Sequence, residues 1–146
     1  MSAGRDATPA PPAVASAAAA RQAAEQLGDR LALGSAPVAA IVLGSGLGGL
    51  AERIEDARRI PFREVPGFPQ ATVHGHAGVL IAGKLSGRPV LAMAGRFHLY
   101  EGHSIASVVH GVRTMARLGI VSALLTNAAG GVEPSWSAGD LMLVTD

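Results

Sequence analysis

The sequence has no cysteine, few aromatic residues and almost no net charge. It holds no Cys, three Phe, one Tyr and one Trp, and its formal net charge is +1. The absence of cysteine excludes disulfides, thiolate nucleophiles and Cys-ligated zinc. The scarcity of aromatic rings and of clustered basic residues argues against a nucleic-acid surface, which needs stacking platforms and concentrated positive charge. We therefore expect no nucleic-acid partner.

Long apolar runs are also missing. No run approaches the roughly 18 residues that a membrane-spanning helix requires, and the Ala-rich segment 12–20 lacks the Leu and Ile of a signal peptide. We expect no membrane partner, no targeting signal and a cytoplasmic location, with which the lack of Cys agrees. The residues are nevertheless 49% hydrophobic and only 16% charged, which is enough apolar material for a folded core.

The order of the expected elements indicates one α/β domain. Residues 1–12, rich in Pro, Ala and Ser, predict a flexible tail, and residues 13–146 predict the domain. Apolar runs and helical spacing then predict, in order, a helix over 13–33, a strand over 38–43, an irregular loop over 58–78, a hairpin of strands 79–85 and 90–94, a helix capped by Ser104, and strands over 120–126 and 141–145. Together these elements predict a mixed β-sheet flanked by helices.

Three irregular segments directly follow expected strands. They are residues 44–49, 95–103 and 127–131. Ligands of open α/β sheets bind at the carboxyl ends of the strands. We therefore expect the three loops to converge on one site.

The first of these loops, Gly44-Ser-Gly-Leu-Gly-Gly49, matches the dinucleotide-binding pattern G-x-G-x-x-G. Its glycines let backbone N–H groups turn toward an anion. A dinucleotide site also needs a full helix and a second apolar strand ending in an acidic residue. Here a Pro-rich stretch follows instead, and Glu64 sits on no apolar strand. A tight turn without a ligand is the alternative interpretation.

The second loop contains Arg96, His98 and Tyr100. A guanidinium matches phosphate oxygens, an imidazole can donate to an anion or a sugar hydroxyl, and a tyrosine suits a ribose edge. An extended backbone would point all three to one side. Taken singly, each residue could equally be a surface Arg, a satisfied His or a core Tyr.

The third loop, Asn127-Ala-Ala-Gly-Gly131, has side chains small enough for a ligand to lie against the backbone, although a crowded core crossing would also need them. His74 and His76 resemble a metal pair, but no carboxylate accompanies them locally. We expect no metal site, and we interpret a His here as lying at the mouth of an anion site.

Taken together, these motifs resemble the trimeric purine nucleoside phosphorylases. The resemblance covers roughly residues 20–146 and rests on four blocks in the family's order: Gly44 to Leu50; Val65-Pro-Gly-Phe-Pro69 with Gly75 to Gly78; Gly95-Arg-Phe-His-Leu-Tyr-Glu-Gly102; and Thr126 to Gly131 with Gly139-Asp140.

The resemblance implies phosphorolysis of purine nucleosides and deoxynucleosides to the free base and α-(deoxy)ribose 1-phosphate, in purine salvage. Inorganic phosphate would be a co-substrate, no cofactor would be needed, and the full-length family implies a homotrimer. By position, the implied phosphate ligands are Ser45, His76, Arg96, Phe97, His98 and Ala128, with His98 also catalytic; the implied ribose or nucleoside contacts are Tyr100, Ala129 and Gly130.

Family members are roughly twice as long, so we expect this chain to hold the phosphate and ribose half of the site without the base-binding half, and to have little activity alone. The alternatives are a non-catalytic phosphate-binding module and, on the first loop only, a nucleotide-dependent oxidoreductase domain.

Overall fold

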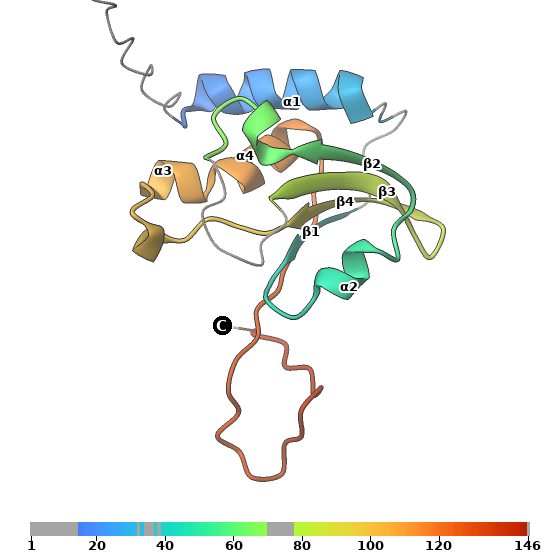
Figure 1. Cartoon of the computed structure of the whole chain (residues 1–146), viewed down its shortest axis with the longest axis vertical. Helices are drawn as coiled ribbons and strands as arrows, with labels where there is room; N and C mark the ends of the chain where they lie inside the picture. The colour runs from blue at the N-terminus through green and yellow to red at the C-terminus, as the bar shows by residue number, and fades with distance from the viewer. Residues whose placement is uncertain (1–14, 32, 34–36, 38, 70–77, 146) are drawn as a thin grey trace, which may run out of the picture.

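The fold is a five-stranded mixed sheet with helices on both faces, in the strand order β2-β3-β4-β1-β5 (Figure 1). The computed structural model describes residues 15–31, 33, 37, 39–69 and 78–145. The elements are α1 (Ala17–Leu31), β1 (Ala39–Leu43), α2 (Gly48–Ala51), β2 (Glu55–Pro61), 3₁₀ helix η1 (Phe62–Glu64), β3 (Val79–Leu85), β4 (Arg88–Ala94), 3₁₀ helix η2 (Leu99–Glu101), α3 (Ile105–Val108), α4 (His110–Arg117) and β5 (Ala123–Leu125). The predicted α/β class with a mixed sheet is confirmed.

Three strands run parallel in the middle and at one edge of the sheet. β1 pairs in parallel with β4 on one side and with β5 on the other. β3 pairs antiparallel with β4 through the predicted hairpin, and β2 pairs antiparallel with β3. Because β1, β4 and β5 point the same way, the loops that follow them start from the same edge of the sheet.

The two faces of the sheet carry separate apolar clusters, because alternate residues of a strand point to opposite faces. Ala40 and Val42 of β1 face α1 and α4, together with Leu91 and Met93 of β4. Ile41 and Leu43, with alternate residues of β3 and β4, face the short helix α2 on the other side. Figure 1 shows α1 and α2 on opposite sides of the sheet. The continuous apolar run of β1 is thus explained by burial on both faces.

Three Phe rings close one end of the larger cluster. Phe62 lies 5.3 Å from Phe68 and 5.2 Å from Phe97, measured between ring centroids, and the pairs are tilted rather than stacked flat. Such tilted pairs stabilise a core beyond the apolar area that they bury. The residues that follow β2 and β4 are therefore anchored to the same core.

Several expected elements are confirmed and others are wrong. The first helix begins later than expected, at Ala17, where the Ser16 hydroxyl accepts from Ala19 N. The bounds of β1 and of the hairpin match the expected ones within two residues. Ser104 caps α3 by accepting from the backbone N–H of Ser107. The helix expected after Ser104 is broken into α3 and α4 at Val109. The last strand of the sheet, β5, is only three residues long.

The prediction of an irregular loop from residue 58 is wrong for its first part, which belongs to β2. β2 is an edge strand whose outer residues are polar and exposed, and an edge strand needs a partner on one side only, so Pro61 is tolerated at its end.

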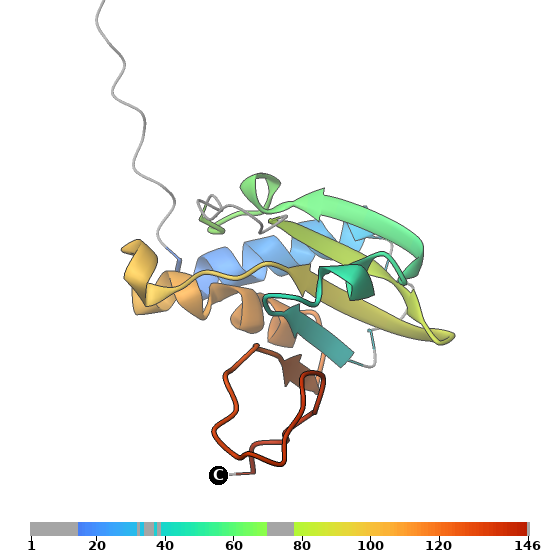
Figure 2. The same ribbon diagram turned by 60° about the horizontal axis from the view of Figure 1, so that its bottom comes forward.

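The predicted strand over 141–145 is also wrong. This stretch pairs with no described strand and Leu141 is 99% exposed. The chain after β5 loops away from the sheet in both views (Figures 1 and 2). Apolar sequence alone therefore predicted a strand where no backbone partner is present among the described residues.

The Phe cluster generates a stability prediction. Phe62 is 1% exposed, so we expect Phe62→Ala to lower the free energy of unfolding by about 3–5 kcal/mol, through lost burial and the cavity left behind. Chemical denaturation measures this change. The control is Ile105→Ala at a 71% exposed position, which should change stability by about 0.5 kcal/mol or less. Equal effects of the two substitutions would contradict the placement of Phe62.

Candidate functional site

The loops that follow β1, β4 and β5 meet at Gly44, Arg96 and Thr126. Thr126 joins the parallel strands: its hydroxyl accepts from Gly44 N at 2.9 Å and donates to Val42 O at 2.9 Å. The guanidinium of Arg96 reaches across from the end of β4 and donates through Nη1 to Thr126 O at 2.9 Å. The expected convergence of the three loops is thus present in the structure.

Gly44 is required by this close approach. A Cβ built on Gly44 would meet Thr126 O, Nη1 of Arg96 and the Cα of Asn127, all of them too close for a real side chain. Two of these neighbours are backbone atoms, which cannot yield as a flexible side chain can. The first glycine of the loop is therefore needed because other loops pack against it.

Arg96 is held in a fixed plane by a second contact. Its Nε donates to Nε2 of His98 at 2.9 Å, while Nη1 holds the Thr126 carbonyl. A guanidinium fixed at two points presents its planar donors in a defined direction, which suits bidentate recognition of a phosphate or carboxylate.

A carboxylate fixes His98 in turn. Oε1 of Glu101 lies 2.5 Å from Nδ1 of His98 and also accepts from the backbone N–H of His98 at 2.9 Å. A carboxylate only accepts, so Nδ1 carries the proton and Nε2 is left to accept from Arg96. The chain Glu101–His98–Arg96 therefore aligns a neutral imidazole in one tautomer, with Nε2 as an acceptor in this arrangement rather than a donor.

Glu101 is the residue that sequence reasoning missed. It was visible only as part of the quoted Gly95–Gly102 block, and its side chain is 6% exposed. The turn of η2 brings Glu101 back to the backbone N–H of His98, three residues earlier, and Gly102 with φ of +82° ends that turn. An acidic residue three positions after a functional His, followed by Gly, is the signal that could have revealed it.

The other expected site residues divide into two groups. Tyr100 lies with His98: the rings stack with centroids 4.5 Å apart, and Tyr100 remains 79% exposed. Ser45 is exposed and directly follows Gly44, and Ala128 directly follows Asn127 at the same junction.

The remaining four differ. The ring of Phe97 is 2% exposed and points into the core, so only its backbone faces the loops. Ala129 and Gly130 are exposed on the segment that leads away from the sheet. His76, with His74, lies outside the described residues.

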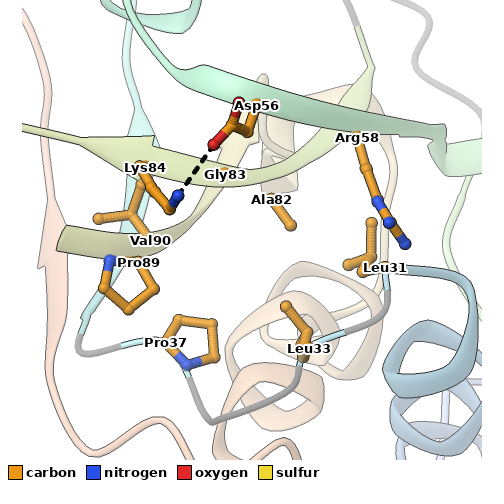
Figure 3. A pocket seen from close by; sticks show the side chains of 10 residues that line it. All are labelled: Leu31, Leu33, Pro37, Asp56, Arg58, Ala82, Gly83, Lys84, Pro89 and Val90. Atoms are coloured by element: carbon orange, nitrogen blue, oxygen red, sulfur yellow. Dashed lines mark hydrogen bonds and ion pairs between the residues drawn. The ribbon is translucent and has the colours of Figure 1, made fainter. Parts of the chain in front are cut away.

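A separate hollow of about 400 Å³ opens at the opposite edge of the sheet, among the residues labelled in Figure 3. It lies near Pro89 at the start of β4 and Lys84 at the end of β3. Lys84 pairs with Asp56 at 2.9 Å, and this hydrogen bond raises the pKa of Lys84 above its ordinary value. Because none of its lining residues belongs to the loops that follow β1, β4 and β5, the hollow is not part of the loop junction.

The helix after the Gly-rich loop is short. α2 ends at Ala51, and the next strand, β2, pairs antiparallel at the far edge of the sheet. A dinucleotide-binding unit places a full helix and then a parallel strand after such a loop. The described arrangement therefore gives no support to the oxidoreductase alternative.

None of the described helices is long and apolar enough to cross a membrane.

Comparison with known proteins places this arrangement in a family. Residues 38–146 match the model of the phosphorylase superfamily, and the chain belongs to that superfamily. Purine nucleoside phosphorylase 1 of Geobacillus stearothermophilus is 50% identical over 112 residues, which cover 77% of this chain and 41% of that protein. The mouse purine nucleoside phosphorylase is 47% identical over 110 residues, covering 75% of this chain and 38% of that protein.

Solved structures agree with the sequence comparison. Isoform 2 of the purine nucleoside phosphorylase of Schistosoma mansoni, in complex with cytosine and ribose-1-phosphate, superposes with a TM-score of 0.77 at 40% identity. The match covers 89% of this chain and 45% of that one. The chain therefore spans less than half the length of these relatives, which are purine nucleoside phosphorylases.

The crowding at Gly44 generates a prediction. We expect Gly44→Ala to destabilise the fold by about 1–3 kcal/mol, because the added methyl must push the Thr126 backbone or Arg96 away. Chemical denaturation measures the change. Gly48→Ala, at the start of α2 just after this loop, is the control, since a Cβ there meets no atom within 4 Å. A Gly44→Ala chain as stable as the Gly48→Ala chain would show that the three loops do not pack together.

Proposed function

We propose that this chain provides the phosphate- and ribose-binding part of a purine nucleoside phosphorylase. The observation that carries the proposal is the junction of Gly44, Arg96 and Thr126, where a fixed guanidinium meets a Gly-rich loop and the start of a small-residue loop. The similarity to purine nucleoside phosphorylases over three quarters of the chain supports it.

In the proposed reaction a phosphate oxygen attacks the anomeric carbon of a purine nucleoside or deoxynucleoside. The bond between that carbon and the base nitrogen breaks, its electron pair leaves with the base, and a proton then completes the free purine. Positive charge grows on the sugar in the transition state, and an anion held beneath the sugar stabilises it. The products are the free purine and α-(deoxy)ribose 1-phosphate, in purine salvage.

The site residues take roles in binding and orientation. Arg96 binds the phosphate, with Ser45, His76, the Phe97 backbone and the Ala128 amide around it. Holding both reactants in place removes much of the entropy cost of bringing them together. His98 is the catalytic residue in this proposal, because its ring lies beside Arg96 and is fixed in direction by Glu101.

The sugar lies on the exposed side of the loops in this proposal. Tyr100, stacked on His98, offers a ring face and a hydroxyl to the ribose. The small residues Ala129 and Gly130 let the nucleoside approach the backbone. For the full-length protein we also propose a homotrimer, a cytoplasmic location and catalysis without a cofactor, with inorganic phosphate as co-substrate.

Calorimetry with inorganic phosphate tests the binding step in this chain. We expect Arg96→Ala to weaken phosphate binding roughly 10-fold to 100-fold, because a charge-assisted hydrogen bond contributes about 1.5–3 kcal/mol. Arg117→Ala is the matched control: it removes the same charge from the last turn of α4, which leads toward the opposite edge of the sheet. No heat at millimolar phosphate, or equal binding by both variants, would overturn the proposal.

A chimera tests the reaction itself. Residues 38–146 of this chain replace the matching part of the Geobacillus relative, and phosphate-dependent release of hypoxanthine from inosine is measured. We expect turnover, and a loss of about 100-fold or more when the chimera carries Arg96→Ala. A folded chimera that binds phosphate without cleaving inosine would instead favour the non-catalytic phosphate-binding alternative.

A further inference from the structure

Glu101 lies between two imidazoles. Its Oε1 is taken by the backbone N–H and Nδ1 of His98, whereas its Oε2 faces Nε2 of His103 at 3.6 Å. The carboxylate is almost fully buried, so its interactions are poorly screened by water. The two oxygens thus face different residues: Oε1 faces His98 of the proposed site, and Oε2 faces His103, which lies outside that site.

Among the described residues, the ring of His103 is held by packing against the core. Its ring stands edge-on to Phe97, with centroids 5.6 Å apart and planes at 83°. Its Nε2 is buried and has no hydrogen-bond partner among the described residues, and Oε2 of the Glu101 carboxylate lies 3.6 Å away. A buried polar atom without a partner is costly, so its position beside a carboxylate needs a physical reason.

We propose that His103 is a positioning residue of the anion site, which acts by holding Oε2 of Glu101 so that Oε1 stays directed at His98. The phosphate-binding part of this inference rests on the proposed function. His103 would touch neither phosphate nor sugar, because Glu101 and His98 lie between it and Arg96.

The mechanism follows from the order of contacts. An N–H on Nε2 of His103 attracts Oε2, which limits rotation of the carboxylate. A fixed carboxylate keeps the proton on Nδ1 of His98, and Nε2 of His98 then continues to accept from Arg96. The charged groups that the described residues place around His103 are Glu101 directly and Arg96 beyond His98. Removing the His103 nitrogens should therefore loosen Arg96 at a distance.

The experiment compares His103→Phe with His103→Gln. Phenylalanine keeps a ring against Phe97 but has no nitrogen, whereas glutamine keeps an N–H donor at a similar reach. The first measurement is the ¹⁵N chemical shifts of the His98 ring, which report its tautomer. The second is phosphate affinity by calorimetry. Ile105→Ala, exposed on the neighbouring helix α3, is the control.

We expect His103→Phe to move the His98 ring away from a pure Nδ1–H tautomer and to weaken phosphate binding roughly threefold to tenfold. His103→Gln should restore most of both properties, and Ile105→Ala should change neither. Unchanged His98 signals in the Phe variant, or equal changes in the Phe and Gln variants, would overturn the inference.

The two proposals fail separately. If the unaltered chain binds no phosphate, the proposed function falls, while the His98 signals still decide the role of His103. If His103→Phe does not fold, His103→Ala decides, because it also removes both ring nitrogens. His98 ring signals that stay unchanged in that variant contradict the inference.

Discussion

The site depends on one contact, the hydrogen bond from Nη1 of Arg96 to the carbonyl of Thr126 above Gly44. It links the end of β4 to the end of β5 across the end of β1. Because backbone atoms form two sides of the junction, only glycine fits at position 44. The parallel pairing of β1 with both neighbours brings these three chain ends to one edge, and the buried faces of the sheet keep them there.

A second constraint acts on the direction of the guanidinium. The His98 ring holds Nε of Arg96, and the Glu101 carboxylate holds the His98 ring. Phe97, between Arg96 and His98 in sequence, turns into the core and anchors the backbone of this segment. A core side chain thus lies between two functional ones, from Arg96 to His98. This is how a loop outside regular structure can hold a charged group rigidly.

Much of this could be predicted from the sequence. The apolar run of β1, the hairpin of β3 and β4 and the Ser104 cap each follow from local patterns, and the convergence of the loops follows from a rule about parallel strands.

Other features depend on tertiary contacts. β2 is polar and ends in Pro61, so nothing local indicates a strand until β3 is present to pair with it. Residues 141–145 show the opposite error, since their apolar sequence finds no described strand to join. Glu101 was missed because its role arises from the 3₁₀ turn of η2, and the burial of Phe97 depends on the ring of Phe62, more than thirty residues earlier.

The most direct test of the central claim is a crystal structure of this chain with ribose 1-phosphate. The account predicts a phosphate group bound by Arg96, with the Gly44–Ser45 backbone and the Ala128 amide around it and the sugar toward Tyr100. A phosphate found only elsewhere, for example in the hollow beside Lys84, or an Arg96 side chain directed away from Thr126, would contradict it.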